Sequence, residues 1–457
     1  MPSLAGRQAL LAAIGPVCLF MACGTASPSH IDPALASEIE STPAIDNHAH
    51  VVRVTSDGDR DREFDALPVD NMEPASDPLW LRPDRPRLLE AWRELFGYKA
   101  GQWTPGASGD REALRAQVAR KHGTAYPAWI LDRLHIETMV ANRVALGAGL
   151  ENPRFMWAAY ADALMFPLDT SSLASRNSDR RAFFALEHSL FDRYALESTA
   201  ALPADSKPLV PPTLGAYLSS MVTPTLERHR RGGAIAEKFE AAYLRDLDFS
   251  PADRVRAERT YSAFLDRTPP DADYKILQDF LFRYIAAECG RLGMAVHLHT
   301  GAGAGSYFDV AGINPLLLES VLDDPSLRKT SFVLLHGGWP FERDIAALLV
   351  KPNVYVDFSS LSLLQPASSL AGTLREWLEW VPEKVMFGTD AYPYSSDLSW
   401  ETSAWLANAN GREALSAALT GMMRDGEITR GRARQLGRMV MHDTAKALYT
   451  LPGQSRP

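Results

Sequence analysis

Five potential metal ligands stand in four short segments spread along the chain, residues 44–52, 294–301, 332–338 and 385–390. The candidates are His48, His50, His299, His336 and Asp390. Residues two apart on a strand point to the same face, so His48 and His50 are placed to bind one ion together. Imidazoles with a carboxylate suit zinc, iron, manganese or nickel better than calcium or magnesium. A hydrolytic metal centre is therefore the first hypothesis.

No member of this set is decisive alone. The chain has 11 histidines, and a strand often ends in a structural histidine. Asp390 alone would also fit a helix N-cap. All four segments, however, place the polar residue at the C-terminal end of a predicted strand, where a (β/α)₈ barrel gathers its active site.

Eight strand-like runs, most of them followed by a helical pattern, predict an α/β chain folded as a (β/α)₈ TIM barrel. The predicted strands cover residues 44–52, 137–146, 155–166, 234–243, 294–300, 331–336, 353–358 and 385–390. A helix is expected over residues 274–292, ending at Gly293. The barrel as a whole is expected to occupy residues 31–452.

Two long helical insertions interrupt this pattern, after the first and the third predicted strand. The first covers residues 53–86 and continues into helical segments near 88–96 and 111–122, and the second covers residues 170–231. Both positions lie on the catalytic face of a barrel, so a lid or a substrate wall is at least as good an interpretation as solvated decoration.

Composition is that of an ordinary soluble globular protein, with 23% charged and 46% hydrophobic residues in 457. The net charge of −9, without a long basic run, argues against nucleic acid as a partner.

Residues 1–22 have the pattern of a signal peptide. The apolar run at 9–22 is too short to span a membrane, which takes ~20 residues. Residues 19–24 resemble the lipobox of bacterial lipoproteins, with Cys23 as the acylated residue, although Phe20 stands where leucine is usual. We therefore expect an exported protein, either periplasmic or anchored to the membrane by lipid. Ordinary cleavage at a nearby alanine and a misassigned start codon are the competing interpretations.

Several motifs resemble those of the amidohydrolase superfamily. They include Asp46-Asn47-His48-Ala49-His50, Leu298-His299-Thr300-Gly301, Leu335-His336-Gly337-Gly338 and Gly388-Thr389-Asp390-Ala391. Within it the chain resembles the amidohydrolase-related (amidohydrolase 2) branch, and most of all the amidohydrolase halves of proteins fused to a glutamine-synthetase-like domain. The similarity spans about residues 40–450. The chain departs from those proteins by its export signal and by showing no synthetase-like segment.

The resemblance implies that His48, His50 and Asp390 hold one divalent metal. It implies that His299 and His336 hold a second ion, or act as a ligand and an acid/base beside a single one. Zinc is the expected metal, with manganese, iron and nickel as alternatives.

Two further residues take their interpretation from the family. Lys238 lies in the fourth predicted strand, where binuclear members carry a carboxylated lysine that bridges two metals. The alternative is a lysine that faces solvent or pairs with a neighbouring glutamate. His297 shares a face with His299, but the family's ligand is the histidine before Thr-Gly, so we expect His297 to lie deeper in the barrel.

Such a site predicts hydrolysis of a C–N or C–O bond in an amide, ester or lactone by metal-bound hydroxide, since a metal lowers the pKa of its water to ~7. Asp390 would carry the proton from the water to the leaving group, and His336 would stabilise the oxyanion if it is not a ligand. Position alone suggests contacts to a small-molecule substrate from Arg143, Asp162, Tyr307, Trp339, Tyr392 and Tyr394.

Two other classes of function remain open at this point. The same superfamily includes decarboxylases and sugar-acid isomerases, so a lyase or isomerase is the second reading. An exported metal-binding or ligand-binding protein without turnover is the third. The sequence also leaves the oligomeric state open, a homo-oligomer included.

Overall fold

The computed structural model describes residues 31–55, 61–65, 85–198, 210–302 and 309–449. The predicted signal peptide with Cys23, and also Tyr307, lie outside these residues. Within the described part of the chain, no helix combines the length and apolar character needed to cross a membrane.

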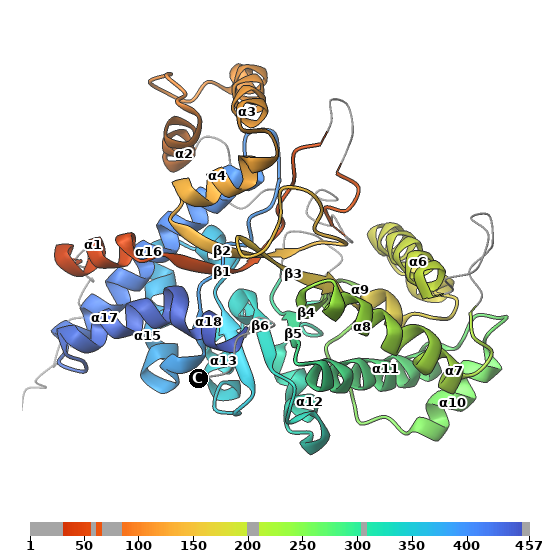
Figure 1. Cartoon of the computed structure of the whole chain (residues 1–457). Helices are drawn as coiled ribbons and strands as arrows, with labels where there is room; N and C mark the ends of the chain where they lie inside the picture. The colour runs from red at the N-terminus through yellow and green to blue at the C-terminus, as the bar shows by residue number, and fades with distance from the viewer. Residues whose placement is uncertain (1–30, 56–60, 66–84, 199–209, 303–308, 450–457) are drawn as a thin grey trace, which may run out of the picture. The chain divides into compact units, whose positions relative to one another are not determined.

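Eight parallel strands pair in chain order and form the centre of the fold (Figure 1). They are β1 (Ala44–Ala49), β2 (Ile136–Asn142), β3 (Phe155–Tyr160), β4 (Ala234–Phe239), β5 (Ala295–His299), β6 (Phe332–Leu335), β7 (Val354–Asp357) and β8 (Val385–Met386). A parallel bridge between Ala49 and Ala391 joins the last strand segment to the first. The backbone N–H of Asp390 also donates to the carbonyl of His48 at 2.8 Å. The predicted (β/α)₈ barrel is confirmed.

Helices follow the strands and surround the barrel. The main ones are α8 (Thr223–Arg231), α9 (Ala241–Leu244), α10 (Arg254–Ala263), α11 (Asp271–Leu292), α12 (Glu319–Leu322), α13 (Glu342–Leu348), α14 (Leu361–Leu364), α15 (Ala367–Trp380) and α16 (Trp400–Arg424). Before and after the barrel lie α1 (Pro33–Ser41), α17 (Arg430–Arg438) and α18 (Thr444–Leu448). The short 3₁₀ segments are η7 (Pro315–Leu318), η8 (Pro325–Leu327), η9 (His336–Gly338) and η10 (Pro382–Lys384), and η11 (Met439–Asp443) is a π-helical segment.

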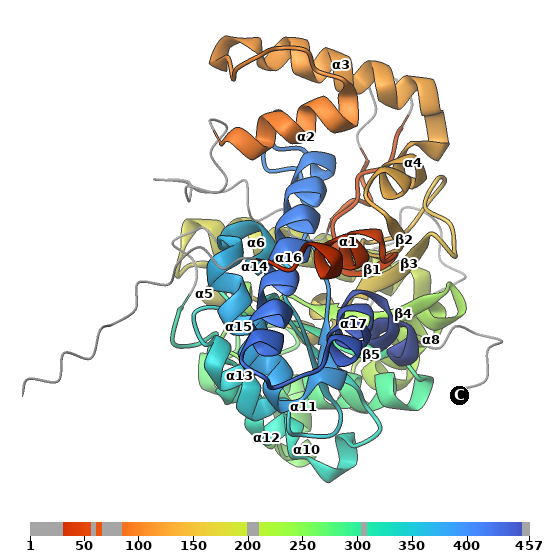
Figure 2. The same ribbon diagram turned by 90° about the vertical axis from the view of Figure 1, so that its left-hand side faces the viewer.

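The two insertions are helical, as expected. The first contains α2 (Pro86–Phe96), η3 (Pro105–Ala107), α3 (Ser108–His122), η4 (Gly123–Ala125) and α4 (Tyr126–Arg133). The second contains α5 (Ser171–Ala174), α6 (Ser178–Ser198), α7 (Leu214–Tyr217), η6 (Leu218–Val222) and α8, and η5 (Asp162–Met165) precedes it. Figure 2 shows α2 and α3 stacked beyond one end of α16, which packs against α2.

Two apolar layers stabilise the barrel. The larger fills the space between the strands and the outer helices. The smaller lies inside the barrel, where Ile45, Val140, Val333 and Leu335 pack together and the C-terminal Tyr449 joins them. Burial of this apolar surface is the main stabilising contribution to the fold.

Several strands end earlier than their apolar pattern predicts. β3 ends at Tyr160 rather than at residue 166, because the next residues form the buried turn η5. β4 ends at Phe239 rather than at residue 243, where α9 follows, and β8 covers Val385–Met386 alone. The extra apolar residues are buried in turns at the barrel's C-terminal face. The predicted helix end at Gly293 is confirmed by the left-handed φ of 68° at that glycine.

Candidate metal centre

Three of the predicted ligands meet at the C-terminal face of the barrel. One ligand atom from each of His48, His336 and Asp390 lies within 4.8 Å of the others. The carboxylate of Asp390 is central: its Oδ1 lies 3.2 Å from Nε2 of His48 and 3.6 Å from Nε2 of His50. Its Oδ2 lies 3.7 Å from Nδ1 of His336. Three of the four predicted histidine ligands therefore converge on the carboxylate of Asp390.

The fifth predicted ligand, His299, stands beside this cluster. Its ring centroid lies 4.4 Å from that of His336. Its Nε2 is 3.0 Å from the carbonyl of Gly301, to which it donates a hydrogen bond. The ring of Tyr243, after β4, packs against it at 4.5 Å between centroids. His299 is thus held at the edge of the cluster.

The polypeptide turns sharply where two of the ligands stand. His336 and Asp390 have φ angles of 66° and 55°. Such values are uncommon for residues other than glycine and mark positions that the surrounding structure must hold in place. Asp46 helps to hold the turn after β8 in place. Its Oδ1 accepts from the N–H of Thr389 at 2.9 Å, and its Oδ2 accepts from the Thr389 hydroxyl at 2.5 Å.

His50 is oriented by a carboxylate from the first insertion. Nδ1 of His50 lies 3.1 Å from Oδ2 of Asp65, and the Tyr160 hydroxyl donates to Oδ1 of Asp65 at 2.5 Å. Burial lowers the pKa of His50, but the charge and hydrogen bond of Asp65 raise that pKa overall. An imidazole that gives its Nδ1–H to a carboxylate keeps Nε2 for a metal, as metal-binding histidines commonly do.

His48 is oriented by Asn142 at the end of β2. The side-chain nitrogen of Asn142 lies 2.8 Å from Nδ1 of His48, while Oδ1 of Asn142 has no hydrogen-bond partner among the described residues. Rotating the amide by 180° would place that oxygen to accept Nδ1–H, leaving Nε2 of His48 to bind a metal.

The electrostatics favour the neutral imidazole at three of the four histidines of this site, and His50 is the exception. Burial lowers the pKa of His48, His299 and His336 well below the ordinary value, and the positive charge of Lys238 contributes to all three shifts. Burial raises the pKa of Asp390, an effect that the charges of His50 and Lys238 oppose. Neutral imidazole is the form that binds metal, so the donor set fits a divalent transition metal.

Lys238 reaches the same cluster from β4. It is fully buried, and its Nζ lies 3.5 Å from Nε2 of His48 and 4.0 Å from Oε1 of Glu240. This placement excludes a lysine that faces solvent. The contact with Glu240 agrees with the alternative of a lysine that pairs with a neighbouring glutamate.

The predicted substrate contacts divide into three groups. Trp339 is 43% exposed after β6. Tyr392 is buried with its ring centroid 5.4 Å from that of His50, and Tyr394 packs on Tyr392 at 5.2 Å. Tyr307 lies outside the described residues. Trp339 is therefore the exposed aromatic side chain among the described members of this set, and its contact with a substrate stays a prediction.

Arg143 and Asp162 are placed for structural roles. The Arg143 guanidinium is fully buried and pairs with both carboxylate oxygens of Asp61 at 2.9 Å, while Nε donates to the Ala145 carbonyl at 2.8 Å. It anchors the first insertion through Asp61. Asp162 is 1% exposed and accepts the N–H of Glu240 at 2.8 Å. Burial raises the pKa of Asp162 to about 7.

The position of His297 agrees with the expectation from sequence. It is fully buried, and its Nε2 lies 2.7 Å from the hydroxyl of Tyr449 rather than near Asp390. Residues that orient the ligands were missed, above all Asp65 and Asn142. Their only sequence signal was an acidic residue in a long insertion and a polar residue at a strand end.

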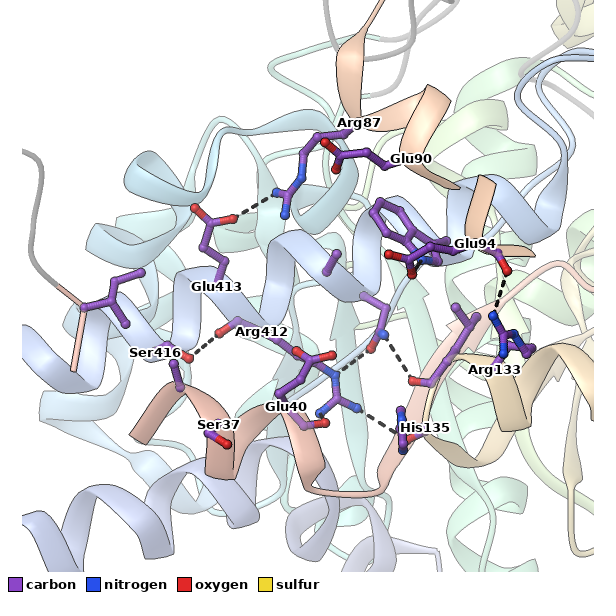
Figure 3. A pocket seen from close by; sticks show the side chains of 16 residues that line it. Ser37, Glu40, Arg87, Glu90, Glu94, Arg133, His135, Arg412, Glu413 and Ser416 are labelled. Carbon is purple, nitrogen blue, oxygen red and sulfur yellow. Dashed lines mark hydrogen bonds and ion pairs between the residues drawn. The ribbon is translucent and has the colours of Figure 1, made fainter. Parts of the chain in front are cut away.

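A separate cavity of about 560 Å³ lies between α1, α2, α4 and α16 (Figure 3). Its lining includes Leu134 and His135, which precede β2, so it borders the N-terminal ends of the strands. Arg412 on its wall donates to the carbonyls of Glu40 at 3.1 Å and Thr42 at 2.9 Å. This arginine holds the turn before β1, and the cavity has no part in the metal centre.

Comparison with known proteins assigns the family. A family model described as amidohydrolase matches residues 214–451, just over half of the chain. The chain belongs to this family. The resemblance read from the motifs is thereby confirmed, and the protein is a metal-dependent enzyme of the amidohydrolase superfamily.

One curated relative of this amidohydrolase is Protein fluG from Emericella nidulans. It is 28% identical over 225 residues, which are 46% of this chain and 25% of the fungal protein. The match thus spans about a quarter of the relative's length.

Solved structures at low identity share the fold. A Lactobacillus casei protein classed as a metal-dependent hydrolase has a TM-score of 0.56 at 17% identity, covering 91% of this chain and 97% of its own. Uronate isomerase from Thermotoga maritima has a TM-score of 0.56 at 14% identity, covering 91% and 96%. Glucuronate isomerase from Caulobacter crescentus has the same TM-score and identity, covering 93% and 95%.

Proposed function

We propose that this amidohydrolase is a hydrolase that cleaves a C–N or C–O bond of an amide, ester or lactone. The observation that carries the proposal is the position of Asp390, whose carboxylate faces His48, His50 and His336 at 3.2 to 3.7 Å. The pKa values of His48 and His336 are lowered, which favours their neutral forms, while that of His50 is raised. A carboxylate set among these imidazoles at a barrel mouth suits both metal binding and proton transfer.

The side chains that would hold the metal are those of the cluster. His48, His50 and Asp390 are assigned to one ion, with His299, His336 and Lys238 beside it for a second ion or for catalysis. When bound, a divalent metal supplies Lewis acidity, which polarises a carbonyl oxygen and makes a water more acidic.

Asp390 is assigned the proton transfers. Its side chain is 14% exposed, against 0% for His48 and 5% for His336, so it is the most accessible of the three to a substrate. Burial raises the pKa of its carboxyl group, which makes it a better proton acceptor than an exposed aspartate. It would take a proton from the attacking water and return it to the leaving group.

The surroundings of the cluster would orient the substrate. Trp339, which follows η9, offers an exposed aromatic face, and its carbonyl accepts the N–H of Ala302 after β5 at 2.8 Å. This hydrogen bond joins the loops after β5 and β6. Together they would form one wall against the substrate's apolar part.

The proposal is tested by metal analysis together with a substrate screen. Protein purified without chelator should contain a transition metal, and His48→Ala should lose most of it. A panel of amides, lactones, carboxylated aromatics and uronic acids in H₂¹⁸O should yield a product carrying one solvent oxygen. Turnover of a panel member without ¹⁸O incorporation would overturn the assignment as a hydrolase.

A sugar-acid isomerase or a decarboxylase is the second candidate. The observation that favours it is again Asp390 beside His336, because this pair would equally move a proton between neighbouring carbons of a sugar acid. The same panel separates the candidates, since an isomerase gives a product of unchanged mass and a decarboxylase releases CO₂.

A further inference from the structure

Tyr449, directly after α18, closes the end of the barrel opposite the candidate metal centre. Its side chain is 5% exposed and packs inside the barrel with Leu335 and Met386. It also borders a small cavity with Met294 and Ser331, which stand at the N-terminal ends of β5 and β6. The phenol therefore enters the barrel from its N-terminal face.

The hydroxyl of Tyr449 hydrogen-bonds to residues of β1 and β5, and the donor and acceptor of each bond can be assigned. Its oxygen lies 2.5 Å from Oδ1 of Asn47, which can only accept, so the single hydroxyl proton goes to Asn47. Its oxygen also lies 2.7 Å from Nε2 of His297, which must then be the donor. Tyr449 thereby helps to hold the amide of Asn47 with its nitrogen facing the other way.

From Asn47 the hydrogen bonds continue to the cluster. The side-chain N–H of Asn47 donates to Oδ2 of Asp357 at 2.6 Å. Oδ1 of Asp357 accepts from the Ser359 hydroxyl at 2.6 Å and from the N–H of His336 at 3.0 Å. Because Ser359 has given its proton to Asp357, its oxygen accepts Nδ1–H of His336 at 2.9 Å.

Every member of this series is buried. Asn47, Asp357 and Ser359 are 0% exposed and His336 is 4% exposed, so water does not compete for these bonds. The series leaves the proton of His336 on Nδ1 and Nε2 available as a ligand or as a base. Asn47 also directly precedes His48 in β1, so its position affects a second ligand.

We propose that Tyr449 is a positioning residue of the metal centre. Its hydroxyl fixes the tautomer and orientation of His336 through Asn47, Asp357 and Ser359. The inference rests on the proposed function, because it assigns His336 to that centre. Partners of this kind orient metal ligands in other proteins, and their loss commonly weakens metal binding ~10- to 100-fold.

Tyr449→Phe is the direct test, because it keeps the ring that fills the barrel and removes the hydroxyl alone. We expect binding of Zn²⁺ to weaken about 10-fold, measured by competition with a chelator. The visible absorption of the Co²⁺ form should shift. Tyr217→Phe is the matched control, since Tyr217 is also fully buried and donates to a carbonyl, that of Leu164 at 2.8 Å. Equal Zn²⁺ affinity in the wild type and both variants would overturn the inference.

A double-mutant cycle tests the route. Ser359→Ala removes the last link, so Tyr449→Phe should add little to its effect, whereas independent contributions would multiply. Multiplying effects would contradict a connected series.

A third measurement needs no variant. The ¹⁵N spectrum of labelled histidines in metal-free wild type should show Nδ1–H at His336, and an Nε2–H tautomer would overturn the inference. His48→Ala separates the two proposals: if it loses metal while Tyr449→Phe binds normally, the positioning role fails and the metal centre stands.

Discussion

At the scale of single residues, the candidate centre depends on which nitrogen of each imidazole carries the proton. Asp65 takes Nδ1–H of His50, and Ser359 takes Nδ1–H of His336. In both cases a buried polar group leaves Nε2 for chemistry. The more exposed carboxylate of Asp390 then lies between two imidazoles that carry their protons on Nδ1.

Asp390→Asn separates the binding role of this carboxylate from its role in proton transfer. The amide keeps the size and one oxygen but loses the charge and the basicity. We expect metal to be retained in part, because the histidines remain, and kcat to fall by about 10² to 10⁴. Metal content and turnover are measured on one preparation, with exposed Asp266→Asn as the control. Near-normal turnover would remove Asp390 from the mechanism and make His336 the next candidate for the base.

Asp65→Asn tests the contribution of the first insertion to the centre. The variant still accepts the Tyr160 hydroxyl but offers His50 a neutral partner in place of a carboxylate. Metal affinity should fall about 10-fold or more, measured by chelator competition. Glu63→Gln changes a carboxylate of the same loop that pairs with Arg53 and Arg193, and it should bind metal normally. Unchanged affinity in Asp65→Asn would make this contact incidental.

At the scale of elements, sequence periodicity located every strand but not every strand end. Residues 161–166 are apolar because they are buried in η5, and burial alone does not distinguish a strand from a turn. The ligand motifs were visible because each stands directly after a strand, where the fold determines its direction. The role of Asp65 could not be predicted from the sequence. Its position beside His50 depends on the hydrogen bonds between Asp61 and Arg143, which is remote in sequence.

Arg412, on the opposite face of the barrel, likewise makes contacts with residues remote in sequence. Its guanidinium, 1% exposed, donates from α16 to carbonyls in the turn before β1, to the carbonyl of His135 at 3.3 Å and to Asn408 at 2.9 Å. Arg412→Ala should lower the free energy of unfolding by about 2–4 kcal/mol, because buried carbonyls lose their donors. Urea unfolding measures this. Arg424→Ala on the exposed face of the same helix should leave the midpoint unchanged. An unchanged midpoint in Arg412→Ala would show that these carbonyls do not depend on the arginine for stability.

At the scale of the whole molecule, the N-terminal segment raises the question of location. We propose that Cys23 is acylated after export, from its lipobox-like sequence. Cys23→Ser should then move the protein from the membrane fraction to the soluble periplasmic fraction. Cell fractionation and mass spectrometry of the N-terminus measure this change. Cys289→Ser, a change at a buried thiol, should leave partitioning unaltered. Identical partitioning of Cys23→Ser and wild type would favour ordinary cleavage.

The candidate metal centre lies on the seam where the barrel closes, between the first and last strand segments. His48 and His50 belong to the first strand segment and Asp390 to the last, and between them the seam has the Ala49–Ala391 bridge and the bonds of Asp46 to Thr389. A metal held by both sides would act as a crosslink present in the folded chain alone.

Removal of the metal should therefore loosen the seam before the rest of the barrel. A ligand at 100 times its Kd stabilises the folded state by about 2.7 kcal/mol, so chelation should lower Tm by several degrees and added Zn²⁺ should restore it. Amide exchange should accelerate at the N–H groups of Asn47, His50 and Asp390, which bond across the seam. The β3–β4 pair, as at Ala158 and Ala236, should exchange at its former rate. His48→Ala should resemble the chelated protein and gain little from Zn²⁺. Uniform acceleration over all eight strands would show that the metal stabilises the fold without bridging β1 and β8.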